Sequence, residues 1–245
     1  MNYQKFDDAC SDILNQAVTS TGIGTLSEKT IHAVLKQYFA PDLCCQEQRV
    51  HNYVADIVID NSIIEIQTRN FNTLRRKLDV FLTTHEVTIV YPVAHKKWLC
   101  WVNEETGEVS KPRKSPKIGT PYQIFPELYR IKQYLSHPNL HLHIVLVDVE
   151  EYRLLNGWSK DKKKGSTRND GIPVGLADEI IIRSREDYKI LLPDTLPKQF
   201  TTKDYKRAAG LSKGNATTAL HVLHYLEVIE RVGKIGNLYL YEITK

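Results

Sequence analysis

The chain has 245 residues, of which 42% are hydrophobic and 25% charged, a composition that is ordinary for globular proteins and excludes a disordered or fibrous one. Its first ten residues contain no apolar stretch of the signal-peptide type, and no later run reaches the ~18 apolar residues of a membrane span, so we expect a cytoplasmic protein with no membrane partner. The four cysteines are irregularly spaced and imply neither a disulfide framework nor a zinc site.

The formal net charge of +4 is concentrated in the C-terminal fifth of the chain. Residues 198–245 carry eight Lys and Arg against four Asp and Glu, which accounts for the whole excess. A basic segment attached to a near-neutral body indicates a polyanion as its partner, although a mild excess of this kind is also common on solvated surfaces.

The first part of the chain alternates between helical and strand patterns. Ile31, Val34, Leu35 and Tyr38 recur at helical spacing, and Ser27 is a suitable N-cap for that helix. The following segments predict three strands, a helix and a further strand: CCQEQRVHNY, VADIVID, SIIEIQT, FNTLRRKLDVFLTT and HEVTIVYPV. The predicted order is therefore α-β-β-β-α-β.

Further elements continue this alternation. KKWLCWV and EVSK predict a hairpin around Thr106 and Gly107, PELYRIKQYL predicts a helix with Pro126 in its first turn, and LHLHIVLVDV predicts a buried strand. Two prolines in LLPDTLPKQF then indicate a boundary near residue 198. We therefore predict a mixed α/β domain over residues 1–197 and a small second domain over residues 198–245.

Two carboxylates interrupt the apolar hairpin YVADIVIDNSIIEIQTRN. A two-residue turn at Asp60 and Asn61 would place Asp56 directly opposite Glu65, with side chains ~5 Å apart, and Gln67 on the same face. Like charges placed opposite each other are destabilising, so something must compensate them. A hard divalent cation such as Mg²⁺ is suited to this, because it prefers carboxylate oxygens and keeps open positions for a phosphate.

Two other interpretations of the acidic pair stay open at this point. One carboxylate could be partnered by a nearby basic side chain such as Arg69 or Arg49. Alternatively, a register shifted by one residue would move the two acids apart.

The helix with Glu28, Asp56 on the second strand, EIQ (Glu65-Ile66-Gln67) on the third strand and the following basic helix resemble the core of the PD-(D/E)XK, restriction endonuclease-like nuclease superfamily. The resemblance covers roughly residues 20–95 and depends on this short motif lying in the right order of elements. It implies that Asp56 and Glu65 bind Mg²⁺ or Mn²⁺, with the Ile66 carbonyl as a further ligand. It also implies that Gln67 orients the attacking water and that Glu28 adds an outer-shell or second-metal carboxylate.

Two residues depart from the pattern of that superfamily. Gln67 stands where a lysine is usual, as in an ExQ variant found among some active restriction endonucleases, and a neutral amide cannot lower the pKa of a water by its charge. Ala55 stands before Asp56 in place of the proline that names the motif. A bound cation can itself activate water, so metal-assisted hydrolysis remains compatible with this sequence.

Basic residues follow the motif directly. These residues could simply form a solvated face of a helix. Alternatively, they could have a function and contact the phosphates of a nucleic acid. The candidate phosphate-contacting residues are Arg69, Arg75, Arg76 and Lys77.

The C-terminal segment predicts helix, short turn, helix and β-hairpin. Thr201 and Asp204 form a capping-box pattern, and Gly210 ends the first helix. This arrangement resembles a winged helix-turn-helix domain over nearly all of residues 199–245, in which the second helix enters the major groove. The residues that would contact DNA are Lys213, Asn215, Thr217, Thr218 and His221 on that helix and Lys234 on the wing. The alternative is a protein-docking or dimerising module.

Together these patterns predict a Mg²⁺-dependent DNA endonuclease that hydrolyses phosphodiester bonds and is targeted to double-stranded DNA by its C-terminal domain. A homodimer is plausible because cutting two strands usually takes two sites. The alternative function is a catalytically inactive, nuclease-like protein that binds DNA or regulates its use.

Overall fold

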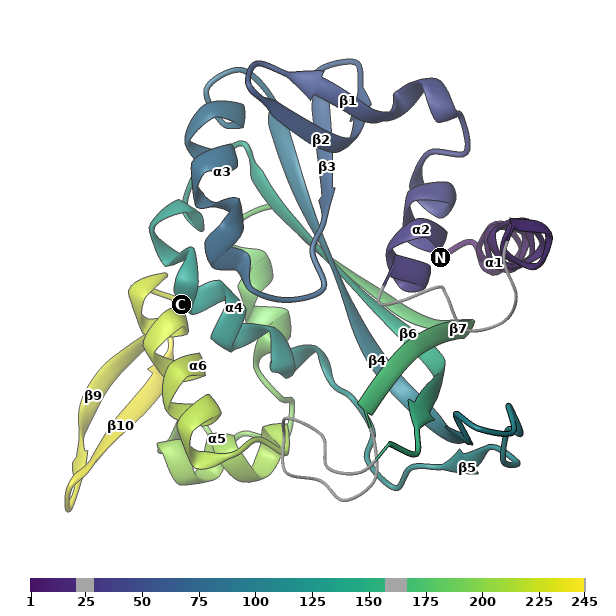
Figure 1. Ribbon diagram of the computed structural model, residues 1–245. Helices are drawn as coiled ribbons and strands as arrows, with labels where there is room; N and C mark the ends of the chain where they lie inside the picture. The colour runs from purple at the N-terminus through teal and green to yellow at the C-terminus, as the bar shows by residue number, and fades with distance from the viewer. Residues whose placement is uncertain (21–28, 157–166, 245) are drawn as a thin grey trace. The chain divides into compact units, whose positions relative to one another are not determined.

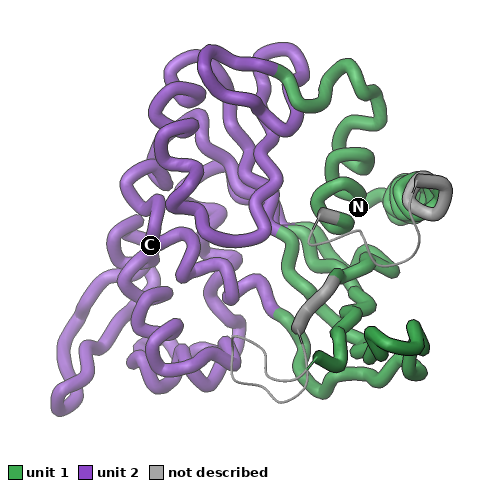
Figure 2. The backbone as a smooth tube through the Cα atoms, viewed as in Figure 1, with its two compact units in different colours: residues 1–48, 92–119, 145–179 green, residues 49–91, 120–144, 180–245 purple. Residues whose placement is uncertain are grey.

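The computed structural model describes residues 1–20, 29–156 and 167–244, and it is a mixed α/β structure (Figure 1). The chain forms two compact units, each assembled from three segments (Figure 2). The first unit contains residues 1–48, 92–119 and 145–179, and the second contains residues 49–91, 120–144 and 180–245. The residues of the predicted C-terminal domain therefore all belong to the second unit.

A mixed sheet forms the centre of the fold. Its order is β1-β2-β3-β4-β6-β7, with β5 paired to β4. β2 and β3 are antiparallel, whereas β3 and β4 are parallel, which confirms the expected mixed α/β class. The strands are β1 (Gln46–Val50), β2 (Tyr53–Ile59), β3 (Ser62–Ile66), β4 (Glu86–Val102), β5 (Arg113–Lys114), β6 (Leu140–Leu154) and β7 (Thr167–Ile182).

In the first unit, α1 (Tyr3–Ser20) packs on α2 (Lys29–Phe39). The side chains that predicted α2 are buried, with Val34 and Leu35 fully so, which confirms that helix. Phe6 of α1 is also fully buried and meets Tyr38 edge to face at 5.5 Å between ring centroids. Ser27 and Glu28, the predicted N-cap and outer carboxylate, lie outside the described residues.

In the second unit, β3 leads through the short 3₁₀ helix η2 (Phe71–Leu74) into α3 (Arg75–Phe81) and then into β4. Leu74, Leu78 and Phe81 are buried, as expected for the core face of this segment. The order from α2 to β4 is α-β-β-β-α-β, as the sequence predicts.

The middle of the chain differs in detail from the prediction. KKWLCWV does not start a new strand, because β4 continues through Pro92 to Val102. Its hairpin partner is β5, where Trp98 faces Lys114, and Gly107 takes the left-handed conformation (φ 72) that the turn needs. The helix predicted from PELYRIKQYL is divided into α4 (Phe125–Arg130) and the 3₁₀ helix η4 (Lys132–Tyr134), preceded by η3 (Pro121–Ile124).

The C-terminal segment follows the predicted order closely. After η5 (Glu186–Leu191) come β8 (Gln199–Phe200), α5 (Thr202–Ala209), α6 (Lys213–Tyr225) and the hairpin of β9 (Ile229–Ile235) and β10 (Leu238–Ile243). The capping box of Thr201 and Asp204 is present, and Gly210 ends α5 in the left-handed region (φ 64). β8, β10 and β9 form a separate three-stranded sheet.

Candidate functional site

The β2–β3 hairpin has the register that the sequence predicts. Asp60 in the turn takes a left-handed conformation (φ 50), and Ile57 faces Ile64 across the pair. One further step of this register puts Asp56 opposite Glu65. The interpretation in which a one-residue shift separates the two acids is therefore excluded.

The two carboxylates have different surroundings. Glu65 is only 2% exposed, whereas Asp56 is half-buried and its Oδ2 accepts a hydrogen bond of 2.7 Å from the Ile66 backbone N–H. Burial first, and then the nearby charge of Asp56, raise the pKa of Glu65, which is about 7 with all its neighbours included. The site therefore holds a carboxyl group that gains or loses its proton near neutral pH.

Lys77 of α3 is the cation that partners Glu65. Its Nζ lies 3.0 Å from Oε1 and 2.7 Å from Oε2, and this contact lowers the Glu65 pKa against the two larger effects. The sequence left open that a basic neighbour such as Arg69 or Arg49 partners one of the two acids; for Glu65 the partner is a lysine on α3 that this alternative did not name. Arg49 Nε donates to the His51 carbonyl at 3.3 Å, and Arg69 is exposed on the loop after β3.

Gln67 is turned toward the loop that follows it. Its Nε2 donates to the Arg69 carbonyl and lies 3.5 Å from Thr73 Oγ1, while its backbone N–H donates to the Val90 carbonyl at 2.9 Å. The amide therefore ties the end of β3 to the start of η2.

The other basic residues of α3 point in different directions. Arg75 donates to Gln133 Oε1 at 3.0 Å and Asn72 Oδ1 at 3.4 Å, and Arg76 is exposed. Successive residues on a helix lie about 100° apart, and of these three it is Lys77 whose side chain reaches Glu65.

Sequence reasoning missed the contribution of α4 to this region. Glu127 accepts a 2.8 Å hydrogen bond from the Phe71 N–H, and Arg130 donates to Asn70 Oδ1 at 2.7 Å. Asn70 has a left-handed backbone (φ 58), so these two contacts hold a sharp turn directly after the EIQ motif. An Asn before an apolar residue was the one local signal of such a turn.

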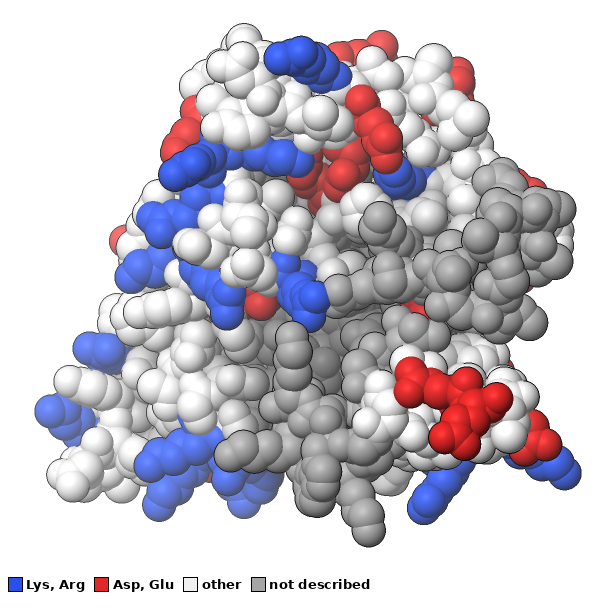
Figure 3. Space-filling model, in the orientation of Figure 1, with Lys and Arg blue, Asp and Glu red and all other residues white. Residues whose placement is uncertain are grey.

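The described part of the surface carries its Lys and Arg unevenly. Figure 3 shows them gathered over α3, α4 and α5, with a group of Asp and Glu bordering them near β2 and β3. A negatively charged chain laid over α3 and α4 would therefore meet cations beside the two carboxylates.

The predicted DNA-contacting residues of α6 fall into two sets. Lys213, Asn215 and Thr217 at its N-terminal end are exposed. The hydroxyls of Thr217 and Thr218 bond to helix carbonyls at 3.0 and 3.1 Å. These four residues remain candidates for contact with DNA.

His221 and Lys234 make contacts that their sequence positions did not reveal. The His221 ring meets the ring of Tyr129 on α4 at 5.3 Å, edge to face, and burial together with neighbouring cations lowers its pKa. Lys132 of η4 also lies over the Tyr225 ring at 4.8 Å, so the C-terminal half of α6 packs against α4 and η4. On the wing, Lys234 lies over the Tyr239 ring at 4.8 Å.

Asp42, Cys44 and Cys45 bring three ligand atoms within 4.8 Å of one another, although the sequence spacing did not suggest a metal site. A hydrogen bond with Asp42 raises the pKa of the Cys44 thiol to about 11, so this thiol keeps its proton at neutral pH. A cation here would have to displace that proton, which makes this group a poorer metal site than a pair of carboxylates.

Among the described residues no helix combines the length and apolar character needed to cross a membrane. The chain is 36% identical over 214 residues to a protein of Treponema pallidum (strain Nichols) described as uncharacterized, a match that covers 86% of this chain and 81% of that protein. No solved structure matches the chain. The family model described as "Domain of unknown function (DUF8091)" matches residues 29–183, which run from α2 to just past β7. The chain therefore belongs to the DUF8091 family.

Proposed function

We propose that the protein is a metal-dependent endonuclease of the restriction endonuclease-like type, acting on double-stranded DNA. The observation that carries this proposal is the buried Glu65 beside Asp56, with a pKa raised to about 7 and Lys77 at hydrogen-bond distance. Perturbed carboxylates of this kind are typical of catalytic sites, although structural ion pairs also produce them.

The donor set suits a hard divalent cation. Asp56 and Glu65 offer carboxylate oxygens from adjacent strands. Burial and, after it, repulsion from Asp56 raise the Glu65 pKa, and a cation would relieve that repulsion. Mg²⁺ or Mn²⁺ would be held by these two residues, with the Ile66 carbonyl next to them in the chain. When bound, such an ion polarises a phosphate and lowers the pKa of water.

The chain's own residues would divide the remaining tasks. Lys77 supplies a positive charge at the carboxylates that Gln67 cannot supply, and it would keep Glu65 ionised and oriented. Gln67 holds the loop after β3 through its amide. Arg76, exposed on the same helix, and Arg69 would contact phosphates on either side of the reacting one.

The order α-β-β-β-α-β from α2 to β4 supports a nuclease-like core within residues 1–197. The capping box, the two helices and the β9–β10 hairpin support a winged helix within residues 198–245. In this proposal the winged helix delivers the catalytic part to DNA, and two chains act together as a homodimer to cut both strands.

One observation favours a second candidate function, a DNA-binding protein without catalytic activity. The Lys77 ammonium donates hydrogen bonds to both carboxylate oxygens of Glu65 and so compensates that buried negative charge without a metal. If this pair is permanent, the nuclease-like part serves only as a scaffold for DNA or partner binding.

Nicking of supercoiled plasmid in Mg²⁺ or Mn²⁺ separates the two candidates. We expect wild-type protein to nick the plasmid, and Asp56→Ala and Glu65→Ala each to abolish nicking while retaining DNA binding. Glu104→Ala, which removes an exposed carboxylate in a surface turn, is the matched control and should cleave like the wild type. Absence of nicking by the wild type in both metals, or nicking by both site variants at the wild-type rate, would overturn the nuclease proposal.

A further inference from the structure

The C-terminal segment contains an open groove with a volume of about 850 Å³. Its walls are α5, the first residue of α6 and the tip of the β9–β10 wing. A volume near the upper end of the range for ligand sites is too large for a single ion and suits an extended ligand. The lining residues are Thr201, Thr202, Lys203, Asp204, Lys206, Arg207, Lys213, Ile235 and Leu238.

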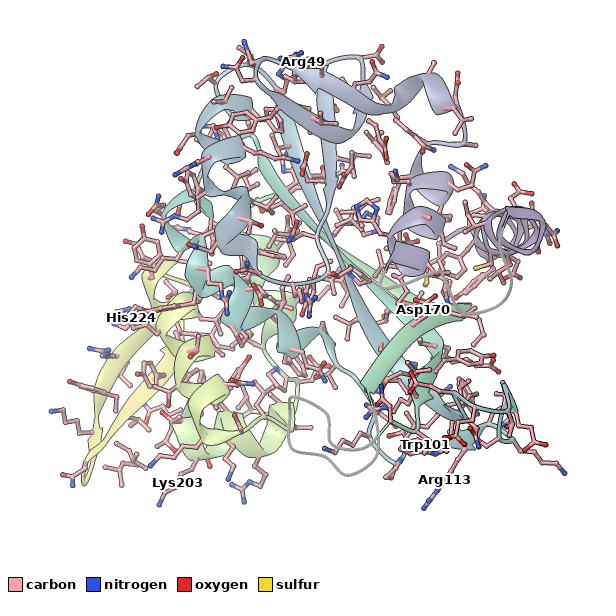
Figure 4. All side chains as sticks on the ribbon, viewed as in Figure 1. Arg49, Trp101, Arg113, Asp170, Lys203 and His224 are labelled. Atoms are coloured by element: carbon pink, nitrogen blue, oxygen red, sulfur yellow. The ribbon has the colours of Figure 1, made fainter. Side chains whose placement is uncertain are left out.

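The groove is strongly basic. Lys203, Lys206 and Arg207 stand at positions i, i+3 and i+4 of α5 and therefore share one helix face, and Lys213 adds a fourth cation from α6. All four are exposed, and Figure 4 shows Lys203 on the outer side of α5. Of these four cations, Lys213 alone was predicted from the sequence to contact DNA.

Asp204, the one carboxylate among the described residues that line the groove, already has hydrogen-bond partners. Asp204 accepts hydrogen bonds from the Thr201 N–H at 2.9 Å and hydroxyl at 2.7 Å, and from Arg207 Nη2 at 2.9 Å. It therefore closes the helix cap and offsets only part of the positive charge. The described residues that line the groove keep a net excess of three positive charges, and three of their four cations lie along the α5 wall.

The length of that wall fits a nucleic-acid backbone. α5 has eight residues and so extends about 12 Å. One strand of duplex DNA presents a phosphate about every 3.4 Å along the helix axis, so roughly three phosphates span this distance. The aliphatic stems of the lysines, with Ile235 and Leu238, form an apolar floor, and the charged ends are free to stand at the rim.

The packing of α6 also favours this groove as the main contact surface. His221 and Tyr225, in the C-terminal half of α6, are in contact with Tyr129 and Lys132. A bound duplex would therefore contact the N-terminal end of α6. Lys213 at that end lines the groove.

We infer that the groove between α5 and the wing binds the phosphate backbone of DNA through Lys203, Lys206, Arg207 and Lys213. The choice of DNA as the polyanion rests on the proposed function. Binding of DNA in the groove needs no metal and no hydrolysis, so groove binding and nuclease activity can be tested separately.

The test measures binding of the full chain to a fluorescent duplex in EDTA over a range of salt concentrations. The variant Lys203→Gln/Lys206→Gln/Arg207→Gln removes three groove cations. The control Lys189→Gln/Lys198→Gln/Arg185→Gln removes two lysines and one arginine outside the groove, each paired at the surface with a carboxylate. Both triple variants lower the net charge by the same amount, and melting curves confirm that each is folded.

We expect the plot of the logarithm of the DNA-binding constant against the logarithm of the salt concentration to become less steep in the groove variant. The magnitude of its negative slope should fall by about 2.7, because each of the three lost phosphate contacts contributes about 0.9. Its affinity near 0.1 M salt should fall by more than tenfold, while the control changes both quantities far less. Equal losses in the two variants would show that net charge alone matters and would overturn the inference. So would a wild-type protein that binds polyglutamate but not DNA, because the groove would then serve an acidic protein partner. A protein that binds through the groove but never nicks plasmid would contradict only the nuclease proposal.

Discussion

Lys77 Nζ lies within 3.0 Å of both carboxylate oxygens of Glu65, although the two residues come from different elements, α3 and β3. Glu65 is almost completely buried, whereas the Lys77 side chain keeps 24% of its surface exposed. The lysine can thus leave for solvent at modest cost, but the carboxylate cannot. A buried carboxylate with a removable partner can change between ion pair, protonated acid and metal ligand.

The raised pKa of Glu65 predicts a pH-dependent stability. In the unfolded chain the group titrates near 4.5 and in the folded chain near 7, so the folded state binds the proton more tightly. The stabilisation is complete below pH 4.5 and is lost as the pH rises through 7, by roughly 3 kcal/mol in total. Urea unfolding at several pH values from 4.5 to 8 should show this decline for the wild type and a flatter curve for Glu65→Gln. Parallel curves for the two proteins would contradict it.

Removing the lysine should be costly only when Glu65 is ionised. We expect Lys77→Met to lower the free energy of unfolding by about 1–3 kcal/mol at pH 8 and by less at pH 5, where Glu65 is protonated. Arg76→Met is the matched control. Arg76 is the exposed neighbour of Lys77 on α3, so its replacement should change the free energy of unfolding by less than about 0.5 kcal/mol. Equal effects of the two variants at pH 8 would mean that Lys77 acts only as a surface charge.

The hairpin shows how far local sequence signals reach. A side-chain period of two and a turn at Asp60 and Asn61 determine which residues oppose each other, so the Asp56–Glu65 relationship could be predicted from the sequence. The caps of α5 could be predicted for the same reason, since Thr201, Asp204 and Gly210 act within a few residues.

The partner of Glu65 could not be predicted in this way. Choosing Lys77 over Arg69 or Arg49 requires the rotation of α3 against the strands, which depends on tertiary packing rather than on spacing. The same limit applies to His221, which is exposed, as its pattern predicts, but whose ring also meets Tyr129 from a segment about 90 residues earlier. Long-range contacts decided both cases.

The packing of His221 predicts unequal roles along α6. We expect His221→Ala to change duplex affinity by less than threefold, because its ring is engaged with Tyr129. Asn215→Ala should weaken binding by about fivefold or more, since an exposed Asn near the helix start is placed to read a base. Fluorescence anisotropy at fixed salt measures both. A larger loss for His221→Ala would mean that α6 leaves α4 when DNA binds.

Proton and cation should compete for the same Glu65 oxygens, which gives a test of the metal proposal that does not depend on cleavage. At pH 8 Glu65 is mostly ionised, and 10 mM Mg²⁺ with a dissociation constant of about 1 mM would stabilise the folded state by about 1.4 kcal/mol. For a chain of this size that corresponds to a rise in Tm of about 3–6 °C. At pH 5 Glu65 holds its proton and the rise should disappear. Differential scanning fluorimetry with KCl at matched ionic strength provides the baseline, and Glu65→Gln should show no rise at either pH. A rise of the same size in Glu65→Gln would place the cation elsewhere and would remove the main support for a metal at the β2–β3 hairpin.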